Sequence, residues 1–193
     1  MPDRPHVVAV CGSLRDDSYT RKALRIALDE AENRGASVDL IDLRELDLPV
    51  FDADDDDAGD APELRERVGR ADSVVLGTPV YHGSYSSALK TALDYCGFDE
   101  FEHATVGLLC VAGGSFPITS LDHLRSVARS LNAWVVPHQV ALPKVRTKFD
   151  GSDLREEGDA ERVRTLGQRV VEYADIEPDP PCPESVENVG ASD

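Results

Sequence analysis

The chain alternates between short apolar runs and longer segments in which apolar residues recur every three or four positions. Five apolar runs have the length of a buried β-strand, and glycine or polar residues bound them. They cover residues 7–11, 37–43, 72–78, 104–112 and 133–136. The periodic segments are typical of amphipathic helices. They cover residues 18–34, 62–71, 85–96, 118–131 and 160–174.

Boundary residues support several of these helices. Gly35 follows the first helix, Pro62 begins the second, Ser84 is the expected N-cap of the third, and Gly97 ends it. Because strands and helices alternate, neighbouring strands must run parallel, with helices on both faces of the sheet. The pattern therefore predicts an α/β fold, a three-layer sandwich around a five-stranded parallel sheet.

Three segments fit neither pattern. Residues 44–61 are expected to form a long loop, and residues 143–159 an irregular stretch. Within the first, Asp54 to Asp57 form a run that lacks the spacing of a calcium-binding loop, so a solvated charged surface is expected there. The proline-rich, acidic residues 176–193 predict a disordered tail behind one domain of residues 1–175.

Composition narrows the class of protein. A net charge of −17 argues against nucleic acid or an anionic membrane surface as a partner. The chain has no apolar run of membrane-spanning length and does not begin like a signal peptide, so a soluble cytoplasmic protein is expected. The dispersed acidic excess and the preference for arginine over lysine suggest a halophilic source, although an ordinary acidic protein is an alternative.

The four cysteines show no metal-binding spacing. Cys11 and Cys110 lie in apolar runs, where cysteine behaves as a small buried hydrophobic residue. We therefore assign no redox or metal role to the cysteines.

Chemistry is expected where strands end. In an open parallel sheet, ligands bind beyond the carboxyl ends of the strands, at the point where the strand order reverses. Three loops follow such ends, at residues 12–18, 79–84 and 113–117. Each contains glycine, hydroxyl or aromatic residues and precedes a helix, whose first N–H groups are free to bind an anion.

The first loop is the strongest candidate for a phosphate site, although an ordinary strand–helix connection is an alternative. Ser13, Ser18 and Thr20 offer hydroxyl donors, and Arg15 or Arg21 offers a guanidinium. The glycine fingerprints of dinucleotide-binding and P-loop proteins are both absent. Flavin mononucleotide (FMN), with one phosphate and a planar polar ring, is therefore the ligand that fits the three loops best.

Three stretches share residues with a known family of flavoproteins. They are GSLR at residues 12–15 with Ser18 and Arg21, TPVYHGS at residues 78–84, and Leu89-Lys90. The chain resembles the NAD(P)H-dependent FMN reductases of the flavodoxin-like fold over about residues 6–175. The resemblance implies an oxidoreductase in which NADPH or NADH reduces bound FMN, and a small-molecule acceptor (a free flavin, a quinone or an azo compound) then takes the electrons.

The resemblance also implies FMN-binding residues in all three loops. Ser13, Arg15, Ser18 and Thr20 would bind the phosphate; Pro79, Val80, Tyr81, His82, Gly83 and Ser84 would line the ribityl chain and the ring; Ala112, Gly113 and Gly114 would approach the far end of the ring. No catalytic side chain and no metal are expected, because the flavin carries the hydride chemistry.

Two side chains of the second loop have alternative interpretations. Tyr81 is expected to contact the ring, but it could be a surface tyrosine with its hydroxyl in water. His82 could donate a proton to a quinone, but a solvated histidine is the simpler interpretation.

The third helix bears on the oligomeric state. It carries an apolar stripe formed by Tyr85, Leu89, Ala92, Leu93 and Cys96. The resemblance implies a homodimer or homotetramer through this helix, and core packing is the alternative. The competing function is a flavodoxin-like electron carrier or FMN-binding module without NAD(P)H turnover. The cysteine spacing excludes an iron–sulfur flavoprotein.

Overall fold

A computed structural model describes residues 4–174 of the chain; the predicted tail at 176–193 lies outside the described residues. Its main sheet contains β1 (His6–Cys11), β2 (Ser37–Asp42), β3 (Ser73–Pro79), β4 (Thr105–Val111) and β5 (Trp134–Leu142). All neighbouring strands are parallel, in the order β2-β1-β3-β4-β5. This is the strand order of the flavodoxin-like fold, so the predicted fold class is confirmed.

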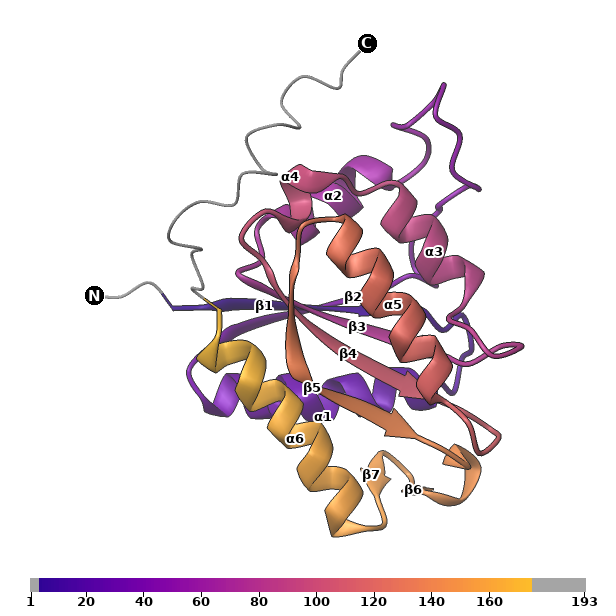
Figure 1. Cartoon of the computed structure of the whole chain (residues 1–193), viewed down its shortest axis with the longest axis vertical. Helices are drawn as coiled ribbons and strands as arrows, with labels where there is room; N and C mark the ends of the chain where they lie inside the picture. The colour runs from indigo at the N-terminus through magenta and orange to yellow at the C-terminus, as the bar shows by residue number, and fades with distance from the viewer. Residues whose placement is uncertain (1–3, 175–193) are drawn as a thin grey trace.

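Helices cover both faces of the sheet and complete the three layers (Figure 1). One face packs against α1 (Tyr19–Asn33) and α6 (Glu157–Glu172). The other packs against α2 (Ala61–Gly69), α3 (Ser87–Asp94), α4 (Phe98–Phe101) and α5 (Ile118–Ser130). The central strands read as continuous apolar runs because helices bury them from both sides.

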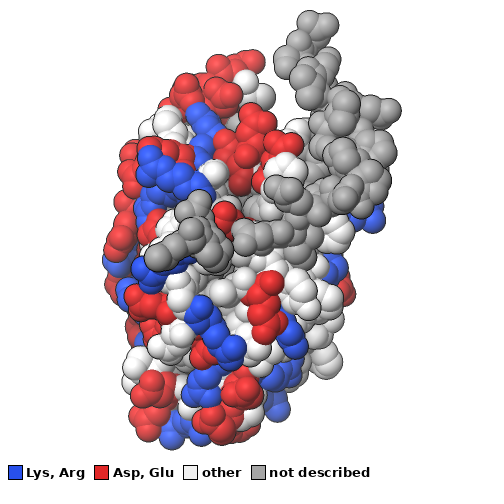
Figure 2. Space-filling model, turned by 90° about the vertical axis from the view of Figure 1, so that its left-hand side faces the viewer, with Lys and Arg blue, Asp and Glu red and all other residues white. Residues whose placement is uncertain are grey.

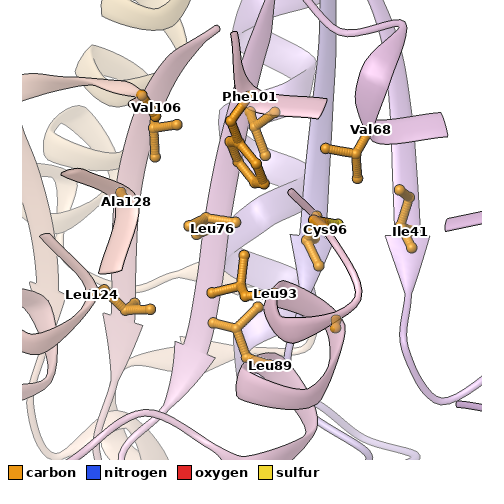
Figure 3. Close-up of a cluster of buried hydrophobic side chains, with 14 of the residues drawn as sticks. Ile41, Val68, Leu76, Leu89, Leu93, Cys96, Phe101, Val106, Leu124 and Ala128 are labelled. Atoms are coloured by element: carbon orange, nitrogen blue, oxygen red, sulfur yellow. The ribbon is translucent and has the colours of Figure 1, made fainter. Parts of the chain in front are cut away.

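The core on the α3 side contains most of the apolar stripe of the third helix. Leu89 and Leu93 of α3 lie with Leu76 of β3 in one buried cluster, beside Phe101 of α4 (Figure 3). Ala92 and Cys96, from the same stripe, are also buried within the chain. Core packing, the alternative interpretation, therefore accounts for most of the stripe.

The structure differs from the predicted elements in four places. The third helix begins at Ser87 and is capped by Ser86, whose Oγ accepts from Leu89 N (3.2 Å); Ser84, the predicted N-cap, lies in the preceding hairpin. β5 continues past residue 136 to Leu142, although it contains Pro137. A proline is tolerated there because β5 is an edge strand, and a register shift in its pairing with β4 accommodates it.

The third difference lies after β5, where an irregular stretch was expected. The segment contains a short 3-10 helix, Val145–Thr147, and a hairpin of two two-residue strands, β6 (Phe149–Asp150) and β7 (Asp153–Leu154). The four-residue helix α4 was also not predicted. The long loop between β2 and α2, in contrast, has neither helix nor strand, as expected.

Charged side chains are mixed over the surface. Acidic and basic side chains lie next to one another on the molecular face shown in Figure 2. The guanidinium of Arg67 on α2 binds both carboxylate oxygens of Asp39 on β2, each at 2.9 Å. Between residues 4 and 174, no helix is both long and apolar enough to span a bilayer.

Candidate functional site

The site lies where the strand order reverses. The chain passes from β1 to β2 on one side and then returns to place β3 on the other side of β1. Loops that leave neighbouring strands in opposite directions open a crevice at their carboxyl ends. The loop at residues 12–18 follows β1, the loop at 80–86 follows β3, and the loop at 112–117 follows β4. All three predicted loops therefore share one edge of the sheet.

The first loop presents a row of free backbone donors. In the described part of the chain, the N–H groups from Ser13 to Thr20 find no acceptor. Ser18 has extended backbone angles and caps α1, where its Oγ accepts from Arg21 N at 3.1 Å. Its Oγ also lies 4.0 Å from Cys11 Sγ, and the side chain is buried. Free N–H groups at the positive end of a 15-residue helix form an anion site.

Arg15 is the free cation of this loop. Its exposed guanidinium has no ion-pair or hydrogen-bond partner among residues 4–174. The neighbouring aspartates are bound elsewhere: Asp17 pairs with Lys22 at 2.6 Å, and Asp16 pairs with Arg44. The alternative of an ion pair between Arg15 and these aspartates is therefore not formed.

Arg21, the other candidate guanidinium, is held by a carboxylate. Its Nη1 lies 2.6 Å from Oδ2 of Asp42, which is buried at the carboxyl end of β2. The hydrogen bond to Asp42 raises the pKa of Arg21. Asp42 therefore neutralises the charge of Arg21, and Arg15 is the guanidinium left for an anion.

Ser86 joins the first loop to the second. Its Oγ donates to the carbonyl oxygen of Gly12 at 2.6 Å, and its N–H donates to Thr78 Oγ1 at 2.9 Å. The approach is so close that a Cβ at Gly12 would lie 2.8 Å from Leu89 Cβ and 2.9 Å from Ser86 Oγ. Glycine is therefore required at residue 12 for the loop after β1 to pack on the start of α3.

The second loop is a tight hairpin. Tyr81 and Ser84 exchange two backbone hydrogen bonds, of 2.9 and 3.1 Å. The central residues His82 and Gly83 both have positive φ, at 50° and 82°, as in type I′ turns. Their N–H groups have no acceptor within the described residues. The turn presents these two donors at its tip, and the ring of Tyr81 is 50% exposed beside them.

Two side chains of α5 hold this hairpin in place. Thr119 Oγ1 donates to the carbonyl oxygen of Gly83 at 2.7 Å. His123 Nδ1 is joined by a hydrogen bond of 2.9 Å to Ser84 Oγ, and the His123 ring packs edge-on against Tyr85. Neither residue was identified from the sequence, because a threonine and a histidine on an exposed helix face give no signal of their contacts.

The third loop contains two glycines, Gly113 and Gly114, with open space beside them. The N–H of Ala112 donates to Leu142 O, and that of Val80 donates to Val111 O, each at 2.9 Å, so these two predicted residues use their donors in the sheet. The N–H groups of residues 113 and 114 have no acceptor in the region described. A Cβ at either glycine would meet nothing within 4 Å. The loop leaves room for a ligand at this point.

The remaining predicted residues occupy the same edge. Pro79 is the last residue of β3, and Thr20 is the second residue of α1. Ser13, Ser18 and Thr20 are buried, whereas Arg15 is exposed. The backbone N–H groups and Arg15 are therefore the accessible donors for a phosphate, with the serine and threonine hydroxyls beneath them.

The three described cysteines, Cys11, Cys96 and Cys110, are free and buried. Burial raises the pKa of Cys96 and Cys110 to about 12, and burial also raises the pKa of Cys11. These thiols are therefore neutral at physiological pH. No cluster of three His, Cys, Asp or Glu side chains suited to a metal ion occurs between residues 4 and 174.

The sequence of the chain is similar to that of a known protein family. The chain matches the model of the family described as NADPH-dependent FMN reductase over residues 5–147. It is 31% identical over 178 residues to an FMN-dependent NADPH-azoreductase of Staphylococcus aureus, which covers 88% of this chain and 95% of the relative.

Solved structures agree in fold. An NADH:FMN oxidoreductase in its apo form superposes with a TM-score of 0.73 at 22% identity, over 91% of this chain and 92% of that chain. The NAD(P)H:acceptor oxidoreductase FerB of Paracoccus denitrificans gives 0.74 at 19% identity, over 88% and 97%. With the family match and the azoreductase relative covering most of its length, the chain belongs to the NADPH-dependent FMN reductase family.

Proposed function

We propose that the three loops hold FMN across the β1–β3 crevice and that NADPH or NADH reduces it there. Family membership makes the protein an NAD(P)H-dependent FMN reductase; the residues that hold FMN are our proposal. The observation that carries it is the first loop, where the N–H groups from Ser13 to Thr20 and the guanidinium of Arg15 are all unpaired in the described structure. This donor set suits a phosphate dianion.

The phosphate is assigned to the first loop. Arg15 supplies a charge-assisted contact, and the backbone donors at the start of α1 surround the phosphate oxygens. Ser13, Ser18 and Thr20 add hydroxyl donors from the floor of the loop. Local donors of this kind are needed because the chain carries a net charge of −17, which opposes the approach of any anion.

The ring is assigned to the second and third loops. Bound FMN supplies the hydride chemistry. The free N–H groups of His82, Gly83 and residues 113–114 are donors that can stabilise negative charge at the polar edge of the ring. Pro79, Val80, Ser84 and Ala112 line the same edge of the sheet. Thr119 and His123 fix the hairpin, so its donors are positioned before the ligand arrives.

The acceptor is proposed to be a planar, largely apolar molecule such as a quinone, an azo compound or a free flavin. Large apolar side chains are exposed on the same loops: Tyr81, Phe116 (86% exposed) and Ile118 at the start of α5. Such side chains bind aromatic molecules by stacking and by burial of apolar area. The azoreductase relative of Staphylococcus aureus is named for an acceptor of this kind.

Removal of Arg15 tests the phosphate assignment. Losing a charge-assisted hydrogen bond costs about 1.5–3 kcal/mol, which corresponds to about a 10- to 150-fold loss of FMN affinity in Arg15→Ala. The affinity is measured by quenching of flavin fluorescence as apoprotein is added. Arg25→Ala is the matched control, because Arg25 is an exposed arginine of α1 with no partner in the described residues. Equal FMN affinity in both variants would contradict the assignment.

The reductase and the electron carrier are separated by the spectrum of the loaded protein. We expect NADPH or NADH to bleach the visible absorbance of bound FMN under anaerobic conditions, and a quinone or azo dye to restore it. Failure to bind FMN would contradict both functions. If FMN binds but neither dinucleotide bleaches it, the reductase function is contradicted, and the electron carrier is the function that remains.

Assembly and cellular setting complete the proposal. We propose a homodimer or homotetramer in a high-salt cytoplasm. The exposed apolar residues near the site favour a subunit interface, and the acidic surface with few lysines favours high salt. Light scattering and unfolding measured over a range of salt concentrations test the two points separately. A monomer, or stability that does not increase with salt, would contradict them.

A further inference from the structure

We propose that Lys144 and Arg146, directly after β5, bind the phosphate groups of the reducing dinucleotide. The inference deepens the proposed function, because it assigns a site for the NAD(P)H that must reach the FMN held by the three loops. It concerns the pyrophosphate that NADH and NADPH share and the 2′-phosphate that only NADPH carries. Both are anions that exposed ammonium and guanidinium groups recognise.

The charge distribution along the chain points to this segment. The whole protein has 37 acidic and 20 basic residues, yet residues 123–149 contain five basic residues and no acidic one. Three of the five, Lys144, Arg146 and Lys148, lie within five positions of one another. In a protein with a net charge of −17, an anionic substrate is repelled except where positive charge is concentrated locally.

Two of these three cations are free. The side chains of Lys144 and Arg146 are exposed, and neither has an ion-pair or hydrogen-bond partner in residues 4–174. Lys148, in contrast, is largely buried and pairs with Asp159 and, at 4.0 Å, with Glu156. Lys144 and Arg146 therefore keep their full charge for a ligand.

Acidic residues farther along the chain do not cancel that charge. Asp159 and Glu156, at the start of α6, are bound to Lys148, and Asp150 lies 3.8 Å from Arg155. Asp159 and Glu156 share Lys148, and none of these three acids pairs with Lys144 or Arg146. Lys144 and Arg146 are therefore the two basic side chains of the segment without an acidic partner among residues 4–174.

The backbone places the two cations beside the FMN loops. The N–H of Lys144 donates to Gly114 O at 2.9 Å, and that of Val145 donates to Ala112 O at 3.0 Å. At the other end of the segment, the ring of Phe149 stacks on Tyr19, the first residue of α1, at 5.3 Å. Residues 144–149 therefore run from the proposed ring loop to the helix of the proposed phosphate loop.

This segment is a separate site from the FMN phosphate site. The FMN phosphate has its own donors in the first loop and Arg15, and the segment after β5 is fixed at both ends along the rim of the crevice. A dinucleotide whose nicotinamide stacks on the flavin must extend its phosphates away from the ring. Lys144 and Arg146 offer free cations on that rim.

The experiment compares dinucleotides in the FMN-loaded protein. Lys144→Gln, Arg146→Gln and the double variant are made, with Arg129→Gln as control, because Arg129 is an exposed α5 arginine without a partner in the described region. We expect KM for the dinucleotide to rise about tenfold or more in the double variant, with kcat unchanged and the control equal to wild type. A rise for NADPH alone identifies the 2′-phosphate, and an equal rise for NADH identifies the pyrophosphate.

Direct binding gives a second readout that does not depend on turnover. Calorimetric titration with 2′,5′-ADP probes both phosphate positions, and titration with 5′-AMP probes one. We expect wild-type affinity for 2′,5′-ADP to fall as salt is added and the double variant to bind weakly at every salt concentration.

Different results would contradict this inference and the proposed function. Wild-type protein that oxidises neither dinucleotide contradicts the function, while the titration still reports on the two cations. Unchanged KM and unchanged 2′,5′-ADP affinity in the double variant overturn the inference, as does an equal effect in Arg129→Gln. A parallel loss of FMN affinity also overturns it, because the cations would then serve the flavin phosphate.

Discussion

Replacing Ser86 by alanine removes one hydroxyl that ties the two central loops together. Ser86 is 3% exposed. Its Oγ donates to Gly12 O at 2.6 Å and accepts from Leu89 N at 3.2 Å, as the N-cap of α3. The variant therefore loses a helix cap and leaves the carbonyl of a buried glycine without its hydrogen bond.

The two losses give the expected magnitude. Loss of a serine N-cap costs about 1 kcal/mol, and an orphaned buried acceptor costs about 1–3 kcal/mol. We expect Ser86→Ala to lower the free energy of unfolding by about 2–4 kcal/mol. For a chain of this length, that corresponds to a fall in Tm of roughly 5–15 °C.

Urea unfolding of the apoprotein, followed by circular dichroism at one fixed salt concentration, measures the effect. The control is Ser87→Ala, because Ser87 is the next residue along α3 and is exposed. We expect the control to stay within about 0.5 kcal/mol of wild type. A Ser86→Ala protein within the same limit would refute the role assigned to this hydroxyl.

Three further predictions concern packing, pH and thiols. In Gly167→Ala the new Cβ would lie 2.1 Å from a carbonyl oxygen of α1, so we expect a loss of about 1–3 kcal/mol in urea unfolding; Gly158→Ala, with no atom within 4 Å of its Cβ, should lose none, and equal losses would contradict the packing. The hydrogen bonds from Arg67 lower the pKa of Asp39, so the pair stabilises the fold fully above the ordinary aspartate pKa of about 4 and less as pH falls through the lower folded value. The stability difference between wild type and Asp39→Asn should therefore shrink on acidification, and a constant difference would be inconsistent with this linkage. Burial raises the pKa of the three described thiols, so a Cys182→Ser variant should react with a disulfide reagent at about pH 8 only after unfolding; rapid labelling of the native protein would show otherwise.

The strands could be predicted because strands that are buried on both faces appear in the sequence as continuous apolar runs. The apolar run at residues 104–112 contains β4, and every residue of that strand is buried. The extension of β5 beyond residue 136 is harder to predict, because the exposed Pro137 and the partly exposed His138 and Gln139 interrupt the apolar run before the buried residues 140–142. There the pairing with β4, including Leu108 with Gln139, decides the structure.

The location of the site could be predicted from the general rule for parallel sheets. Which of its side chains are paired, and which are free, could not be predicted. Parallel strands place their following loops at one edge, so the three loops could be identified together. Which arginine stays free depends on Asp42, at the end of another strand, which takes Arg21. The choice between Ser84 and Ser86 as N-cap likewise depends on the carbonyl of Gly12. Both are contacts between distant residues that local patterns do not record.

The interior position of β1, between β2 and β3, has a consequence for how the chain folds. Val7 of β1 pairs with Ser73 of β3, and the Ser86–Gly12 hydrogen bond joins residues 74 positions apart. Contacts of such high contact order form late, because a long loop must close before they are gained. The crevice between β1 and β3 is therefore complete only when these two strands have paired. A ligand that needs this crevice cannot bind before β1 and β3 pair, so its uptake during refolding would report the closure of this long-range contact.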